Sequence, residues 1–194
     1  MTTFVLATAN PHKAEEMRAV LTPLGVALVD RPDDVAEVDE TGETLEANAL
    51  LKARALVEAT GRAAIADDTG LFVDALDGRP GVRSARYAGE AASYDDNVAK
   101  LLDELGALKT SRTARFVTVI CVAYPDGTAF CVSGELDGEI THARAGDQGF
   151  GYDPVFVPDD ADGRTLAQLT PGEKNALSHR ARALVALSEE LARR

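Results

Sequence analysis

Short runs of consecutive apolar residues alternate, in the first third of the chain, with segments whose apolar residues recur every three or four positions. Three such runs, residues 4–7, 26–29 and 63–66, are too short for helices and predict buried strands. An asparagine–proline pair predicts the start of a helix over residues 10–24, because asparagine is a good N-cap and proline suits the first helical turn. A second helix is expected over residues 45–59, before a glycine in a C-cap position.

The rest of the chain adds two helices and three strands. A serine followed three residues later by an aspartate resembles a capping box and predicts a helix over residues 93–105. Strand-forming residues over 114–124 and 128–133 flank a turn and predict a hairpin. A short strand at 155–157 and a last helix over 170–192 follow. This order of elements favours an α/β fold whose mixed sheet is partly antiparallel.

The turn of the predicted hairpin leaves its register open. If Pro125, Asp126 and Gly127 form a three-residue loop, Cys121 lies opposite Cys131. If the loop has only two residues, the two cysteines point to opposite faces of the sheet. The cysteines do not have the spacing of a zinc site, and in the cytosol we expect both to be reduced.

The last helix is expected to be interrupted. A capping box over residues 170–173, with a proline at the first helical position, predicts where it begins. Because successive helical residues turn by about 100°, Lys174, His179 and Arg180 would point in dispersed directions on one straight helix. Ser178 is a good N-cap for a fresh helix beginning at His179, so we predict a break there.

Composition and charge narrow the class of protein. The chain has 194 residues, of which 45% are hydrophobic, so residues 1–194 suit a single domain, or two tightly joined lobes, with a substantial core. A net charge of −12 without a basic stripe argues against nucleic-acid binding. No secretory signal or membrane-spanning stretch is evident, so we expect the cytoplasm and no membrane partner.

Candidate chemistry begins at the predicted junction between the first strand and the first helix. A helix N-terminus offers backbone N–H groups and partial positive charge, which suit phosphate. Lys13 lies in the first helical turn, where a positive charge opposes the helix macrodipole, so another reason is needed for its presence. The alternative is an ordinary capped helix with a surface lysine. The spacing is not that of a Walker A loop.

Two adjacent carboxylates follow the short strand at residues 63–66. Asp67 and Asp68 repel each other, and their burial without a cation is costly, so the strand end is a sensible place for Mg²⁺. Because neighbouring side chains on a strand point in opposite directions, only one aspartate needs to face the metal. The alternative is a polar turn between two strands that uses Gly70.

Three further features are weaker when taken alone. Gly149 and Gly151 flank Phe150, which would let the backbone approach a ligand and present a ring for stacking; the alternative is a tight turn anchored by the ring. Glu40 lies in an acidic segment of a kind that is usually just solvated. His179 could belong to an exposed helical face.

The ordered combination of motifs closely resembles the inosine/xanthosine triphosphate pyrophosphatases, the non-canonical purine NTP pyrophosphatases (Ham1-like). The resemblance spans the chain from the first motif to the last. Thr69 stands where the family commonly has serine, and Arg83 stands where some relatives carry an aromatic residue and is given no role. The motifs are Thr8-x-Asn10-x-x-Lys13; Glu40-Thr41-Gly42; Glu46 with Asn48 and Lys52; Ala66-Asp67-Asp68-Thr69-Gly70; Pro80-Gly81-x-x-Ser84-Ala85-Arg86-Tyr87; Phe150-Gly151-Tyr152-Asp153-Pro154; and Glu173-Lys174-Asn175-x-x-Ser178-His179-Arg180.

The resemblance implies roles at the phosphate end of a nucleotide. Glu40 and Asp68 would bind Mg²⁺, and Asp68 would also accept the proton of the attacking water. Thr69 would touch the substrate beside Asp68, and Lys52 would add positive charge. The residues that would hold the triphosphate are Thr8, Ala9, Asn10, Pro11, His12 and Lys13.

The resemblance also implies a base site and a fold. Phe150 would stack on the base. The fold would be an elongated α/β structure with a mixed sheet and flanking helices, its two lobes surrounding a central nucleotide cleft, and the protein would be a homodimer. The residues that would enclose the base are Phe150, Gly151, Tyr152 and Asp153, and those that would complete the base and phosphate contacts are Lys174, His179 and Arg180.

The implied activity is Mg²⁺-dependent hydrolysis of ITP, dITP and XTP to the monophosphate and pyrophosphate. Two other classes compete with it. A phosphatase of the haloacid-dehalogenase type needs an Asp-x-Asp spacing after the first strand, whereas Asp67 and Asp68 are adjacent and follow a later strand. A non-catalytic nucleotide sensor would not need Asp68 and Glu40.

Overall fold

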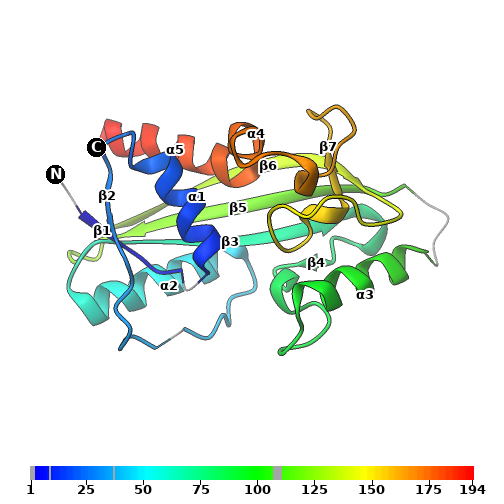
Figure 1. Cartoon of the computed structure of the whole chain (residues 1–194). Coiled ribbons are helices and arrows are strands. Elements are labelled where there is room, and N and C mark those ends of the chain that lie inside the picture. The colour runs from blue at the N-terminus through cyan, green and yellow to red at the C-terminus, as the bar shows by residue number, and fades with distance from the viewer. Residues whose placement is uncertain (1–2, 9, 37, 107–110) are drawn as a thin grey trace. The chain divides into compact units, whose positions relative to one another are not determined.

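The computed structural model describes residues 3–8, 10–36, 38–106 and 111–194, and Figure 1 shows the course of the chain. Two of the helices follow each other directly near the C-terminus. The described strands are β1 (Thr3–Leu6), β2 (Ala27–Val29), β3 (Ala64–Val73), β4 (Pro80–Gly81), β5 (Thr113–Ala123), β6 (Ala129–Ile140) and β7 (Phe156–Pro158), and the α-helices are α1 (Pro11–Leu21), α2 (Leu45–Thr60), α3 (Tyr94–Gly106), α4 (Pro171–Leu177) and α5 (His179–Arg193).

One mixed sheet joins the strands. Its order is β2-β1-β3-β5-β6-β7, and β4 pairs with β3. The strand β1 is parallel to both β2 and β3, whereas β4 is antiparallel to β3 and β7 is antiparallel to β6. The α/β class with a partly antiparallel sheet is therefore confirmed. No helix within the described ranges has both the length and the apolar composition that crossing a membrane requires.

The chain forms two compact units. The first unit comprises Met1–Asp68, Thr118–Gly134 and Arg180–Arg194, and the second comprises Thr69–Val117 and Glu135–His179. The strands β3, β5 and β6 contribute residues to both units. That residues 1–194 act as a single domain stays a prediction.

The first unit has helices on both faces of its strands (Figure 1). Helices α1 and α5 pack on one face, through apolar residues such as Met17 and Leu184 that share a buried cluster with Ile65 of β3. Helix α2 packs on the other face, where Leu56 lies against Ala64. Because side chains alternate along a strand, successive residues of β3 face the two helix layers in turn.

The second unit has its own core. Helix α3 contributes Leu101 and Leu105, which belong to a buried cluster with Leu136 of β6. The rings of Phe116 and Phe156 lie 4.7 Å apart in the same cluster. This core anchors the loops that carry the predicted base-binding residues, because residues of those loops are part of it.

The strand β3 is longer than the sequence predicts. We expected it to end before Asp67 and Asp68, but it continues to Val73, so the placement of both aspartates at a strand end is wrong. Charged residues are tolerated inside the strand because each carboxylate contacts a cationic side chain. Gly70 lies so near Gly81 of β4 that a Cβ atom would be 2.7 Å from its carbonyl oxygen, so the glycine is needed for strand pairing rather than for a turn.

Other boundaries differ in two places. Helix α1 ends at Leu21 rather than near residue 24, because Pro23 has no N–H with which to continue the helical hydrogen bonds. The strand β6 runs to Ile140 instead of Ser133. Its second half alternates exposed acidic residues with buried ones, and this part of the strand pairs with β7.

The hairpin between β5 and β6 has a three-residue turn. The Tyr124 N–H donates to the Thr128 carbonyl oxygen at 2.9 Å, which leaves residues 125–127 as the loop. Cys121 therefore lies opposite Cys131, and the two form a disulfide with their Cα atoms 4.1 Å apart. The expectation that both cysteines are reduced is wrong for this structure, because the register brings the two side chains together on one face.

The predicted break in the C-terminal helix is confirmed. Helix α4 begins with the expected capping box, in which Thr170 and Glu173 bond each other's backbone N–H groups. Ser178 has an extended backbone, with φ −65° and ψ 155°, and α5 begins at His179. His179 and Arg180 thus lie in the first turn of a new helix.

Candidate functional site

Asp67 lies at the centre of a buried ion-pair cluster in the first unit. It faces the layer formed by α1 and α5, where its Oδ2 atom lies 3.2 Å from Lys13 Nζ and 3.3 Å from Arg180 Nη2. Glu16, one turn along α1 from Lys13, pairs with the other side of the Arg180 guanidinium. The side chains of Asp67 and Arg180 are almost completely buried.

The charges around Asp67 are mutually compensated. Burial by itself would raise the pKa of Asp67, but the charges of Lys13 and Arg180 outweigh it and hold the pKa well below its usual range. Burial lowers the pKa of Lys13, and Asp67 opposes that shift. Burial would also lower the pKa of Arg180, but Asp67 and Glu16 raise it. Asp67 therefore stays ionised.

Asp68 lies on the opposite face of β3, towards α2. Its Oδ1 atom accepts a hydrogen bond from Lys52 Nζ at 3.1 Å, and the same ammonium group donates to Glu40 Oε1 at 2.8 Å. Its Oδ2 atom accepts a hydrogen bond of 3.3 Å from Asn48 Nδ2. One lysine thus holds together the two carboxylates that were predicted to bind the metal.

The Asp68 cluster carries an excess of negative charge. Burial raises the pKa of Asp68, Lys52 lowers it and Glu40 raises it further, with a net rise. Burial would lower the pKa of Lys52, but Asp68, Asp67 and Glu40 raise it above its usual value. Two carboxylates with one ammonium leave a negative site that suits a divalent cation.

The residues present fit Mg²⁺. This ion usually keeps several waters and takes one or two protein carboxylates together with substrate phosphates. Glu40 and Asp68 are two such carboxylates. In the part of the chain that the structure describes, no group of three or more His, Cys, Asp or Glu side chains could enclose a metal, so phosphate oxygens or water would have to complete the coordination.

The segment before α1 forms a preordered turn. Asn10 is the N-cap, and its side-chain oxygen accepts hydrogen bonds from the N–H groups of His12 and Lys13, while Pro11 occupies the first helical position. The Asn10 N–H donates to Thr8 Oγ1 at 3.1 Å. Two of the N–H groups that were expected to bind phosphate are therefore used by the cap, and phosphate binding here stays a prediction. Ala9 lies outside the described residues.

A second cluster lies in the second unit and brings together three of the predicted base-site residues. The Asp153 carboxylate accepts hydrogen bonds from the Phe150 N–H at 2.9 Å and from Lys174 Nζ at 2.8 Å. The Lys174 ammonium lies 4.8 Å from the centre of the Phe150 ring. Gly149 makes this loop possible, because it has a φ of 74° and a Cβ atom there would lie 2.1 Å from Asp153 Oδ2.

Other predicted residues have different surroundings. The Tyr152 hydroxyl donates to the Ser84 carbonyl oxygen at 2.9 Å, and the ring is part of the core, so this residue supports the loop. The His179 ring stacks on Phe116 with centroids 4.6 Å apart. Gly151 has a φ of 64°, and Thr69 is half-buried beside Asp68 in β3.

Comparison with known proteins identifies the family. The model of the Ham1 family matches residues 4–190. The chain belongs to the Ham1 family. This confirms the resemblance predicted from the motifs.

Relatives and solved structures match this chain over nearly its whole length. A dITP/XTP pyrophosphatase from an Exiguobacterium species is 47% identical, covering 96% of this chain and 95% of the relative, and one from Bacillus subtilis is 45% identical, covering 96% of each. The structure of a HAM1 protein from Coxiella burnetii has a TM-score of 0.92 and 39% identity, covering both chains completely. The Ham1 protein of Staphylococcus aureus has a TM-score of 0.87 and 38% identity over 98% of each chain.

Sequence reasoning missed the partners of the predicted residues in this Ham1-family chain. Asn48 was named only as part of a motif with Glu46 and Lys52, although it contacts Asp68. Glu16 had a weak signal, since it lies three residues after Lys13 on the same helix. Phe116, on which His179 stacks, had no signal beyond its place in a strand, because the contact is formed only by the tertiary fold.

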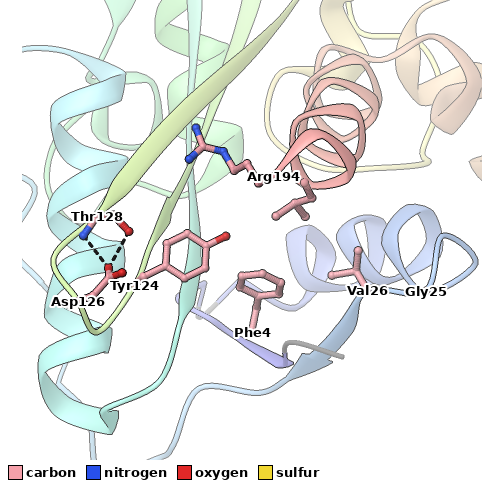
Figure 2. Close-up of a pocket in the computed structure, with 8 residues that line it drawn as sticks. Phe4, Gly25, Val26, Tyr124, Asp126, Thr128 and Arg194 are labelled. Atoms are coloured by element: carbon pink, nitrogen blue, oxygen red, sulfur yellow. Dashed lines mark hydrogen bonds between the residues drawn. The ribbon is translucent and has the colours of Figure 1, made fainter.

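A separate cavity of about 480 Å³ lies in the first unit of this Ham1-family chain (Figure 2). Its polar groups have partners within the fold: the Arg194 guanidinium lies 4.0 Å above the Phe130 ring, and Asp126 accepts hydrogen bonds from Thr128 in the hairpin turn. The rings of Phe4 and Tyr124 pack edge to face. No residue predicted to bind nucleotide or metal lines this cavity, so we assign it no role in the site.

Proposed function

We propose that this Ham1-family chain hydrolyses the non-canonical purine nucleoside triphosphates ITP, dITP and XTP to the monophosphate and pyrophosphate. The relatives from Exiguobacterium and Bacillus subtilis are named dITP/XTP pyrophosphatases. The observation that carries the proposal is the bridge of Lys52 between Glu40 and Asp68, which supplies paired carboxylates and a cation inside one partly buried cluster.

The proposed reaction is the attack of water on the α-phosphorus. The water oxygen forms a bond to the α-phosphorus, the bond from the α-phosphorus to the oxygen that bridges to the β-phosphorus breaks, and pyrophosphate leaves with the bonding electrons. Asp68 accepts the proton of the water, and the raised pKa of its carboxyl group suits a proton acceptor. Burial and Glu40 both raise that pKa, so Asp68 takes a proton more readily than Asp67, whose pKa is lowered by Lys13 and Arg180.

Mg²⁺ is the proposed cofactor, held by Glu40 and Asp68. When bound, it would neutralise negative charge on the phosphates. Lys13 and Arg180 lie on the other face of β3, where Asp67 and Glu16 balance their charges. Their contact with the nucleotide rests on the family resemblance alone. The triphosphate and metal are thus assigned to residues of the first unit.

The base is assigned to the second unit. Phe150 offers a ring for stacking, and Asp153 fixes that ring and Lys174 in one arrangement. A donor such as the Lys174 ammonium can meet the 6-oxygen of hypoxanthine or xanthine, whereas the 6-amino group of adenine would leave it unpaired. Guanine shares the 6-oxygen, so its exclusion requires crowding or an unpaired group at position 2.

The proposal also includes a homodimer and a cytoplasmic location, with no nucleic-acid or membrane partner. The acidic net charge of −12 supports the absence of a polyanionic partner. The homodimer comes from the family resemblance alone.

A panel of nucleoside triphosphates with Mg²⁺ tests the function. We expect kcat/KM for ITP, dITP and XTP to exceed that for ATP, GTP and pyrimidine triphosphates by at least about 100-fold, with pyrophosphate as the product. In ¹⁸O-labelled water, the label should enter the monophosphate. Comparable kcat/KM for ATP and ITP would contradict the substrate class. Orthophosphate as the product would favour a phosphatase, and tight binding without turnover would favour a sensor.

A further inference from the structure

Asn48 connects two segments of the Asp68 cluster. It lies at the end of the first turn of α2 and is completely buried. Its Oδ1 atom accepts a hydrogen bond of 2.7 Å from the Gly42 N–H, and its Nδ2 group donates to Asp68 Oδ2 at 3.3 Å. One side chain therefore holds the loop that carries Glu40 and the strand that carries Asp68.

An amide is the side chain that this position requires. The Gly42 N–H needs an acceptor, and the Asp68 carboxylate needs a donor, so the two ends of the asparagine must differ. An aspartate would place a second carboxylate against Asp68, and an alanine would leave both buried groups without this partner. Neither could replace Asn48 without changing the surroundings of Asp68.

The loop approaches Asn48 so closely that only glycine fits at position 42. A Cβ atom on Gly42 would lie 2.6 Å from Asn48 Oδ1 and 2.8 Å from the Cβ atom of Ala47. The close approach places Glu40, two residues earlier in the loop, where its Oε1 atom meets Lys52. Asn48 and Lys52 are one turn apart on α2, so one rigid helix connects to both carboxylates.

We propose that Asn48 is a positioning residue that fixes the distance between Glu40 and Asp68 and orients the Asp68 carboxylate for the metal and the water. This role rests on the proposed function of the cluster. Asn48 acts through Asp68 and through the loop backbone. Mutation of a side chain that orients a metal ligand typically lowers metal affinity or activity by about 10- to 100-fold.

The chain offers a matched control in the second unit. Asn97 on α3 is also buried, accepts a hydrogen bond of 2.7 Å from the Ala88 N–H and donates to the Ala85 carbonyl oxygen at 3.0 Å. It connects a loop to a helix as Asn48 does, but without a carboxylate. Asn97→Ala therefore removes the same kind of support from a place outside the cluster.

The experiment compares Asn48→Ala, Asn48→Asp, Gly42→Ala and Asn97→Ala with the wild-type chain. Turnover of ITP is measured against Mg²⁺ concentration, and the rise in unfolding temperature with Mg²⁺ is measured without nucleotide. Both Asn48 variants and Gly42→Ala should lower kcat by about tenfold or more and raise the half-saturating Mg²⁺ concentration in both assays. The KM for ITP at saturating Mg²⁺ should change little. Gly42→Ala disturbs the same contact without removing a core side chain.

Asn97→Ala should lower the unfolding temperature and leave kcat and the Mg²⁺ requirement as in the wild-type chain. A folded Asn48→Ala variant with wild-type turnover and Mg²⁺ requirement would overturn the role of Asn48. Equal losses of kcat and of Mg²⁺ affinity in Asn97→Ala would also overturn it, because a general loss of stability would then explain the effects of the Asn48 variants. A wild-type chain that releases no pyrophosphate would instead defeat the proposed function, and the nucleotide-free Mg²⁺ response would still test Asn48.

Discussion

The two neighbouring aspartates of β3 have opposite electrostatic surroundings. Asp67 faces α1 and α5 and contacts two cations, a lysine and an arginine. Asp68 faces α2 and shares its one cation, Lys52, with a second carboxylate, Glu40. The pKa of Asp67 is lowered, because the two cations outweigh its burial, whereas burial and Glu40 raise the pKa of Asp68 above its usual value.

The two aspartates are neighbours in sequence but have different surroundings, because strand geometry sends adjacent side chains to opposite faces of the sheet. The cluster of Asp67, Glu16, Lys13 and Arg180 has no net formal charge, since two carboxylates meet two cations. The cluster of Asp68, Glu40 and Lys52 has a net formal charge of −1. A cluster that is already neutral suits a structural anchor, and a negative one suits a divalent cation.

The largest effect is expected for Asp68→Asn. The amide cannot accept the proton of the attacking water and is a poorer metal ligand, so kcat should fall by at least about 100-fold. The chain should stay folded, because asparagine matches aspartate in shape and can still accept a hydrogen bond from Lys52. Pyrophosphate release from ITP at saturating Mg²⁺ measures the loss, and near-normal kcat would show that Asp68 is not the proton acceptor.

Asp67→Asn should mainly lower the free energy of unfolding and should have a smaller effect on turnover. It leaves Lys13 and Arg180 buried with one carboxylate fewer, and breaking a buried ion pair in this way costs about 3 to 5 kcal/mol. Chemical denaturation measures this loss. The KM for ITP should rise because both cations lose their anchor, whereas kcat should fall less than in Asp68→Asn. An unchanged unfolding midpoint would refute the anchoring role.

Lys52→Met should make the Asp68 face depend on Mg²⁺ for stability. Without the ammonium group, Glu40 and Asp68 repel each other across the site. Mg²⁺ at roughly 100 times its dissociation constant would then restore about 2.7 kcal/mol. Thermal unfolding with and without Mg²⁺ checks this. Mg²⁺ that stabilises the variant no more than the wild-type chain would argue against a metal between these carboxylates.

Glu16→Gln should have the smallest effect. Arg180 keeps its contacts with Asp67, and a glutamine can still accept a hydrogen bond from the guanidinium. Because the pair is buried but the glutamine keeps a hydrogen bond to the guanidinium, we expect a loss of about 1 to 3 kcal/mol in the free energy of unfolding, with turnover close to that of the wild-type chain. A loss as large as that of Asp67→Asn would mean that Glu16, rather than Asp67, is the main anchor of Arg180.

The sequence predicted the elements of the fold and several residues that the structure brings together, such as Glu40 with Lys52 and Asp68. The hydrophobic periodicity and the helix caps depend on local chemistry, which is why the break at Ser178 was predicted correctly. The length of β3 was not, because charged residues inside a strand are explained only by partners such as Lys13 and Lys52 from other elements. The contacts of Asn48 were not predicted for the same reason, because its partners lie in other elements.

The expectation that both cysteines are reduced failed because their pairing depended on a hairpin register that the turn residues did not determine. Only the folded chain chooses between the two registers. Phosphate binding at the start of α1 stays a prediction, and the Asn10 cap uses two of the N–H groups there.

The ratio of kcat between Asp67→Asn and Asp68→Asn tests most directly whether Asp68 is the proton acceptor and Asp67 a structural anchor. Both variants would be assayed with saturating ITP and Mg²⁺ on the same quantity of folded protein. We predict that Asp67→Asn turns over at least about ten times faster than Asp68→Asn, because only Asp68 is placed to accept a proton. Equal kcat values, or a slower Asp67→Asn variant, would contradict the assignment of chemistry to the α2 face of β3.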